Sequence, residues 1–136
     1  MKHVVCAIFG ALGSFIAYLL GGFEASVITL IIFMIIDYLT GLIVAGVFKN
    51  SDKCENGCLN SRAGWKGLCK KFATLMFVII ANRLDVQMGT TFIRDAVCLA
   101  FISNELISIV ENAGLMNIPI PKAITDAISV LKNKSK

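Results

Sequence analysis

Two long apolar runs lie close together near the N-terminus, and they restrict the possible folds more than any other feature of this sequence. Residues 4–20 contain no charged side chain, and residues 26–48 contain only one, Asp37. A helix of about 23 residues is about 34 Å long, which is enough to cross the hydrocarbon core of a bilayer. The chain is 57% hydrophobic with a mean hydropathy of +0.78, more than a soluble domain of 136 residues can bury. We therefore expect an all-α integral membrane protein.

The first run has two possible interpretations. Lys2 followed by an apolar stretch is also typical of a secretory signal peptide. No A-x-A cleavage pattern follows, however, and the second run begins after a short connection, so we expect a helical hairpin. Steps of three and four residues place small side chains on one face of the first helix, although glycine and alanine are also common in such helices. The expected seam for packing between copies consists of Ala7, Gly10, Ser14, Ala17 and Gly21.

Asp37 poses the central question, because an unpaired carboxylate is costly inside a bilayer. Helical spacing places Asp37, Thr40 and Gly41 on one stripe of the second run, so the carboxylate should face other helices or water rather than lipid. Intramembrane carboxylates are often functional. A buried hydrogen bond that fixes the helix register is the structural alternative, and the sequence leaves both open.

Basic residues are concentrated in two blocks outside the apolar runs. The formal net charge is +4, and Lys and Arg gather in residues 48–71 and from Lys122 onward. Under the positive-inside rule this predicts a cytoplasmic loop at 49–63, a cytoplasmic tail at 122–136 and both termini in the cytoplasm. The same distribution argues against nucleic acid as a partner. Because tryptophan and cations favour the headgroup region, the expected interfacial anchors are Arg62, Trp65, Lys66, Lys70 and Lys71.

Two further helices are expected at about 64–89 and 93–112, and both should carry polar faces. Their apolar runs are shorter than a lone membrane-spanning helix requires. Either these helices span the membrane in company and line water, or they lie at its surface. Besides the stripe around Asp37, the expected pore-lining or inter-helix polar face comprises Arg83, Asp85, Asp95, Asn104, Glu105, Ser108 and Glu111. One side of the fourth helix combines Asp95, Cys98, Ile102, Glu105, Ile109 and Asn112.

Pro119 and Pro121 mark a break before a last, amphipathic helix at about 121–133. This helix is too short to span a bilayer and should dock at the inner surface or against the bundle. The whole chain, 1–136, should form one membrane domain with helices at about 4–20, 26–48, 64–89, 93–112 and 121–133. Four spans, or two deep spans with surface helices, both place every basic block on one side of the membrane.

Nothing in the sequence indicates catalysis. His3 is the only histidine and lies at the N-terminus, and no nucleotide-binding or metalloprotease motif occurs. Cys54 and Cys58 form a CxxxC pair without the further ligands that a zinc site requires. We expect no catalytic residues, no cofactor and no metal site.

Four blocks of residues resemble the toxin-secretion/phage-lysis holin family, also called phage holin family 4, to which a clostridial toxin-export holin belongs. In chain order the blocks are IDYLTGLIVA (36–45), NSRAGWKGLCKK (60–71), FIRD followed by FISNE and SIVEN (92–112), and GLMNIPIPK (114–122). The resemblance covers about residues 26–131. Single blocks are weak signals, but four in this order are specific.

This resemblance implies a small protein that assembles with copies of itself in the cytoplasmic membrane of a bacterial host. Its lesions would dissipate the membrane potential and release a cell-wall hydrolase (endolysin) or a toxin, without required direct contact. The implied partners are the lipid bilayer, further copies of the chain and, in some systems, an antiholin. Two alternatives remain open, namely a small oligomeric ion channel or transporter, and a regulatory antiholin.

Overall fold

The computed structural model describes residues 1–53 and 56–134, and all regular secondary structure in this part of the chain is helical, without strands. The helices are α1 (Lys2–Leu20), α2 (Ala25–Ile43), α3 (Ser61–Met88), α4 (Ile93–Leu115) and α5 (Lys122–Lys134). A short π-helical segment, η1 (Val44–Phe48), continues α2, so that the two together cover the second apolar run. The all-α fold class is thereby confirmed for the described residues.

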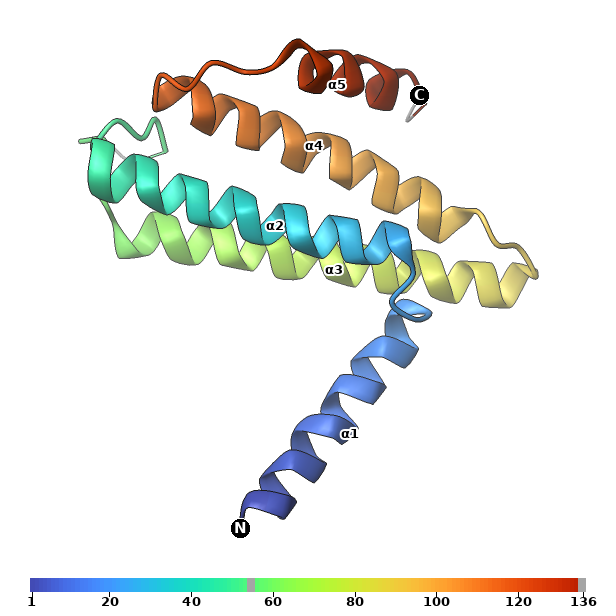
Figure 1. The fold of residues 1–136 in the computed structure, drawn as a ribbon. Coiled ribbons are helices and arrows are strands. Elements are labelled where there is room, and N and C mark those ends of the chain that lie inside the picture. The colour runs from blue at the N-terminus through green and yellow to red at the C-terminus, as the bar shows by residue number, and fades with distance from the viewer. Residues whose placement is uncertain (54–55, 135–136) are drawn as a thin grey trace.

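Helices α2, α3 and α4 lie side by side and form the body of the molecule (Figure 1). α4 packs against both α2 and α3, while α5 lies along the outer side of α4. The core is small and lies mainly where these helices face one another. Its buried apolar residues are Leu20, Val27, Leu30, Met34, Val78, Cys98 and Ile102.

α1 does not form the compact hairpin with α2 that the sequence predicted. It leaves the three-helix body at a wide angle, and its side chains from Lys2 to Ile16 are exposed (Figure 1). The turn between α1 and α2 depends on Gly21, which has a φ of 80°. This left-handed conformation ends α1 because the N–H groups of Gly21 and Gly22 donate back to carbonyl groups in its last turn.

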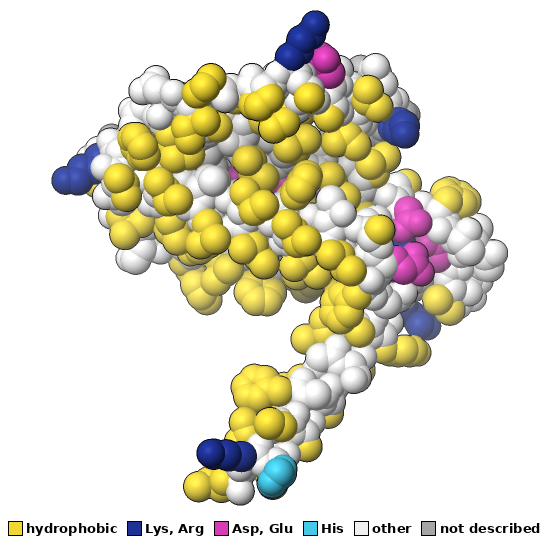
Figure 2. Space-filling view, viewed as in Figure 1, with side chains coloured by type: hydrophobic (Ala, Val, Ile, Leu, Met, Phe, Trp, Pro, Cys, Tyr) yellow, Lys and Arg dark blue, Asp and Glu magenta, His cyan; other side chains and the backbone are white. Residues whose placement is uncertain are grey.

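The surface of the molecule is strongly apolar. α1 and the combined segment Ala25–Phe48 are long and apolar enough to cross a membrane. α3 exposes Phe72, Met76, Phe77 and Ile80, which a soluble protein would bury. Figure 2 shows hydrophobic side chains over most of one face of the bundle and much of α1, with Lys and Arg at the margins. Such a surface suits lipid as its solvent.

α3 and α4 begin where side chains cap their first turns. The Asn60 side chain accepts a hydrogen bond from the Arg62 N–H at 2.8 Å, so α3 starts at Ser61, earlier than the expected residue 64.

The fifth helix, α5, is docked on the bundle, where Leu131 packs against the core. No α5 residue is fully buried, in agreement with its amphipathic sequence.

Candidate functional site

The carboxylate of Asp37 lies inside the bundle and is paired with a lysine. Lys71 Nζ of α3 lies 2.7 Å from Asp37 Oδ2 of α2 and 2.7 Å from Glu105 Oε2 of α4. The exposed fractions of these side chains are 14% for Lys71, 9% for Asp37 and 14% for Glu105. One ammonium group therefore joins three helices, and we call Asp37, Lys71 and Glu105 the charged triad.

The second oxygen of Asp37 is held by α4. Asn112 Nδ2 donates to Asp37 Oδ1 at 3.2 Å and to Thr40 Oγ1 at 2.9 Å. Asn112 is 4% exposed, so an unpaired amide there would be costly. Thr40 in turn donates to the carbonyl oxygen of Ile36, one turn earlier in α2. Both oxygens of the Asp37 carboxylate thus have partners, which is the usual condition for tolerating a buried charge.

Lys71 was expected at the membrane surface as an interfacial anchor, and the structure corrects this assignment. Its side chain points into the bundle because Lys71 shares one side of α3 with the buried residues Val78, Ala81 and Asp85. Spacings of three and four residues connect these positions. The neighbouring Lys70 is rotated by one residue and is exposed. Helical spacing is compatible with an inward Lys71, but the packing of α3 against α2 is what identifies Lys71 as the partner of Asp37.

A cavity of about 490 Å³ lies beside the charged triad, between α2, α3, α4 and the connection that precedes α3. Small residues of α3, namely Ala63, Gly64 and Gly67, leave this space open. Several residues expected on the polar inter-helix face line this cavity. They are Asp37, Gly41, Asn104, Glu105 and Ser108.

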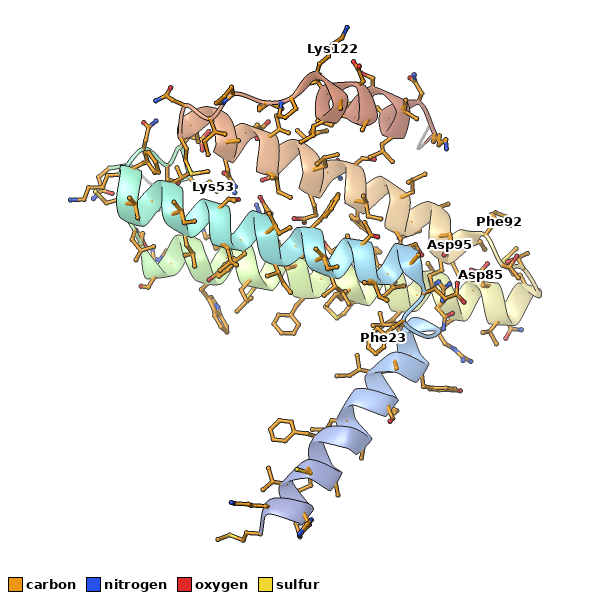
Figure 3. The ribbon with its side chains drawn as sticks, viewed as in Figure 1. Phe23, Lys53, Asp85, Phe92, Asp95 and Lys122 are labelled. Carbon is orange, nitrogen blue, oxygen red and sulfur yellow. The ribbon has the colours of Figure 1, made fainter. Side chains whose placement is uncertain are left out.

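A second polar cluster lies at the opposite end of the three-helix body. Asp85 accepts hydrogen bonds from the N–H groups of Ile93 at 3.0 Å and Arg94 at 2.9 Å, and from Thr90 Oγ1 at 2.6 Å. It therefore satisfies the free N–H groups at the start of α4. In Figure 3, Asp85 and Asp95 lie at the α3–α4 turn, far from Lys53 at the other end. Asp85 is a helix cap in this structure and does not join the face around Asp37.

Arg94, which the sequence did not single out, connects this cluster to the α1–α2 turn. Its guanidinium donates to the Gly21 carbonyl oxygen at 2.7 Å and pairs with Glu24 at 2.6 Å and Asp95 at 3.2 Å. Ser26 donates to Asp95 Oδ1 at 2.8 Å, which adds a contact from α2 to α4. The start of α4 is thus fastened to the turn that follows α1.

Most of the remaining expected site residues are exposed. Lys66 and Lys70 also line the cavity described above. Arg83 and Glu111 are exposed and lie outside both clusters. Arg62, Trp65, Lys66 and Lys70 are exposed on the first turns of α3, and their role as membrane anchors stays a prediction. In the expected seam, Ala7, Gly10 and Ser14 are exposed and Ala17 is half-buried.

Gly21 is a correction to the seam, because it lies beyond the end of α1. A Cβ atom at this position would collide with the side chains of Asn82 and Arg94. Its role in the structure is to allow the turn and the close approach of α3 and α4. Of the CxxxC pair, Cys54 lies outside the described residues.

Comparisons with known proteins identify the family. The sequence matches the bacteriophage holin family over residues 14–133. An uncharacterised protein of Listeria monocytogenes is 37% identical over 130 residues, which are 93% of this chain and 87% of that protein. A 14.9 kDa protein of Clostridium perfringens is 33% identical over 126 residues, 91% of this chain and 89% of the relative.

A phage protein carries a functional name. A protein of Bacillus phage phi105 named "probable holin" is 35% identical over 119 residues, which are 86% of this chain and 81% of that protein. No solved structure matches the chain. The family match includes all of α2 to α4, with both polar clusters, and confirms the resemblance seen in the sequence blocks. The chain belongs to the bacteriophage holin family.

Proposed function

We propose that this chain acts as a holin that accumulates in the cytoplasmic membrane of a bacterial host and opens lesions in it. The lesions would dissipate the membrane potential and release a cell-wall hydrolase or a toxin, without a required direct contact with that cargo. Family membership supports a non-enzymatic membrane protein with a holin role. The observation that carries the proposed mechanism is the charged triad buried between α2, α3 and α4.

The structure corresponds to a closed form in this proposal. The outer surfaces of α1 and α2, and of α3 between Phe72 and Ile80, are apolar, whereas the charges of Asp37, Lys71 and Glu105 are turned inward. In lipid, separating α3 from α2 and α4 would leave these charges unpaired, which is strongly unfavourable. Separation becomes possible only when water replaces the lost partners. A water-filled hole provides that condition, so hydration of the triad and opening occur together.

Shielding of the triad takes place within one chain. Lys71 pairs with both Asp37 and Glu105 inside a single three-helix bundle. Self-association is therefore not needed for a stable closed form. We propose that it is needed for opening, when the inner faces of several bundles surround one aqueous hole.

α1 is the proposed contact between copies. It projects from the body (Figure 1). Its small residues Gly10 and Ser14 are exposed, and apart from neighbouring backbone no atom of the described residues would lie within 4 Å of a Cβ at Gly10. Membrane helices associate by close packing of such small side chains. We therefore propose that α1, most of whose side chains contact no other helix of the same chain, packs against α1 of other copies.

The proposed orientation places the connection before α3 in the cytoplasm, together with both termini. Asn50, at the end of η1, donates to the Leu115 carbonyl oxygen at the end of α4. These two chain segments therefore lie at the same end of the body, as expected if α2, α3 and α4 all cross the membrane. The basic residues gathered at this end favour the cytoplasmic side.

The function is tested by expressing the chain from a controlled promoter in a bacterial host while membrane potential and escape of a cytoplasmic enzyme are followed. We expect an abrupt loss of both at a reproducible time after induction. Loss of potential without enzyme escape would indicate an ion channel instead of a holin. Intact, energised cells at high protein level would contradict lysis and indicate a regulator. An unrelated multi-helix membrane protein expressed at the same level controls for overproduction.

A further inference from the structure

We propose that the cavity beside the charged triad binds the phosphate headgroup of an anionic phospholipid. The lipid would come from the leaflet that faces the connection between η1 and α3. This inference rests on the proposed placement of α2, α3 and α4 across the membrane, but not on the formation of a hole. It concerns a binding site for one lipid molecule, which is distinct from general contact with the bilayer.

The cavity carries more positive than negative charge. Four lysines line it, against the two carboxylates of Asp37 and Glu105. Both carboxylates are already paired with the same lysine, Lys71. Among the described residues, Lys66 and Lys70 of α3 form no ion pair, and they lie one helical turn apart on the same side. Lys53 adds a cation from the connection before α3 (Figure 3). This arrangement suits an anionic ligand.

The first turn of α3 adds further positive potential. Asn60, Ala63 and Gly64 from this turn line the cavity. A helix N-terminus carries a partial positive charge and often holds phosphate groups. The Tyr38 hydroxyl lies over Gly64 and donates to its carbonyl oxygen at 3.5 Å. Because Ala63 and Gly67 have no side chain beyond Cβ, a ligand can approach the backbone of α3 closely at these two positions. A Cβ on Gly67 would meet only Tyr38 Cε2, at 3.9 Å, so the space in front of this glycine is open.

The rest of the lining favours a lipid over free phosphate. Leu42, Ala45 and Leu59 contribute apolar walls to the same cavity as the lysines. A soluble phosphate would leave these walls in contact with water, whereas the glycerol esters and first acyl carbons of a lipid would cover them. Trp65, which is exposed on the first turns of α3, is the residue type that favours the headgroup level of a membrane. A headgroup and the start of its acyl chains therefore match the cavity in chemistry and position.

The test uses the full chain in a non-ionic detergent and native mass spectrometry. Phosphatidylglycerol and phosphatidylcholine with identical acyl chains are added in equal amounts, and the bound lipid is counted. We expect at least fivefold more phosphatidylglycerol than phosphatidylcholine on the wild-type protein. The double variant Lys66→Gln/Lys70→Gln should lose at least fivefold of the bound phosphatidylglycerol. The matched control Lys2→Gln/Lys122→Gln removes two exposed lysines outside the cavity and should bind as the wild type does.

Three results would overturn the proposal. The first is equal retention of the two lipids by the wild-type protein. The second is a loss of bound phosphatidylglycerol in the control variant as large as that in the Lys66→Gln/Lys70→Gln variant. The third is displacement of the lipid by millimolar glycerol 3-phosphate, which would assign the cavity to a soluble phosphate. If circular dichroism shows that the double variant has lost helix, Gly67→Leu decides, because it fills the cavity and keeps all four lysines. Undiminished phosphatidylglycerol on a folded Gly67→Leu protein would also contradict a cavity site. Because the readout is lipid retention, a protein that binds lipid but causes no lysis contradicts the proposed function alone.

Discussion

Replacing Lys71 by methionine tests the role of the charged triad most severely. Methionine keeps most of the volume of the side chain and removes only the ammonium group. The variant leaves two carboxylates, Asp37 and Glu105, that are 9% and 14% exposed and have lost their common partner. Removing one partner of a buried ion pair typically costs about 3–5 kcal/mol. Since both carboxylates lose the same partner, we expect the closed bundle of the Lys71→Met variant to be destabilised by at least about this amount.

This free energy has a direct consequence for opening. A difference of about 3–5 kcal/mol shifts the balance between closed and open forms by roughly two to three and a half orders of magnitude. In the proposed mechanism the open form hydrates the carboxylates and so loses little from the substitution. Lysis of a host that expresses Lys71→Met should therefore begin markedly earlier than lysis by the wild type at equal protein level.

The assay compares lysis time after induction with thermal unfolding of the purified chain in detergent, followed by circular dichroism. Lys122→Met serves as control, because Lys122 is exposed and lies outside both polar clusters (Figure 3). It should match the wild type in both measurements. If Lys71→Met unfolds at the wild-type temperature and lyses cells at the wild-type time, the triad neither stabilises the closed form nor restrains opening.

Three further predictions follow from other contacts. Asp37→Leu removes one acceptor of Asn112 and one partner of Lys71. It should keep membrane insertion, measured by membrane fractionation, but shift or abolish the time of lysis; unchanged timing at equal protein level would refute a role for this carboxylate. Gly21→Ala forces a side chain into a left-handed turn and against Asn82; it should cost about 1 kcal/mol or more and lower the unfolding temperature, whereas an unchanged temperature would show that the turn tolerates a Cβ. Cys6 is exposed on α1, so mild oxidation of membranes should cross-link two copies through it when α1 joins them. Gly10→Leu should reduce this cross-link at equal expression. A Cys6 dimer that is insensitive to Gly10→Leu would contradict packing between copies through the small residues of α1.

Helical periodicity predicts which residues of the fourth helix share a side, but it leaves open whether that side faces other helices, water or the membrane surface. The predicted side comprises Asp95, Cys98, Ile102, Glu105, Ile109 and Asn112. The structure buries Cys98, Ile102 and Asn112 and pairs Glu105 with Lys71, whereas Asp95 is exposed at the start of α4. The reason is that a polar stripe on an otherwise apolar helix has a lower free energy when other helices cover it than when lipid does. This signal is local and depends only on spacing, so a single sequence contains it.

Partners between helices were not predictable in the same way. Lys71 lies in a run of basic residues, Lys70–Lys71, and composition alone assigns the whole run to the membrane surface. Only the packing of α3 against α2 and α4 shows that one lysine of the pair faces inward and the other outward. Arg94 was missed for a related reason, because its partners Gly21 and Glu24 are about seventy positions away in sequence. Such contacts depend on the tertiary arrangement and leave no periodic signal.

The direction of α1 was also beyond the sequence. Two apolar runs joined by a short connection predict a hairpin, and nothing in their composition distinguishes a paired helix from a projecting one. The left-handed turn at Gly21 and the contacts of Arg94 with that turn set the direction in which α1 leaves the body. The sequence identifies Gly21 only as a small residue, whereas its left-handed backbone conformation is what allows the turn after α1.

In the proposed mechanism, the core between α2, α3 and α4 excludes water at rest and admits it when lesions open, and the native Cys98 can report this change. Cys98 is 0% exposed in the core between the helices. In a chain whose other cysteines are replaced by serine, a charged, membrane-impermeant thiol reagent is added to intact cells before and after the loss of membrane potential. We expect no labelling of Cys98 before this moment and rapid labelling from it onward. If Cys98 stays unlabelled while a cytoplasmic enzyme escapes, the hole forms without separation of these helices, and the proposed mechanism is wrong.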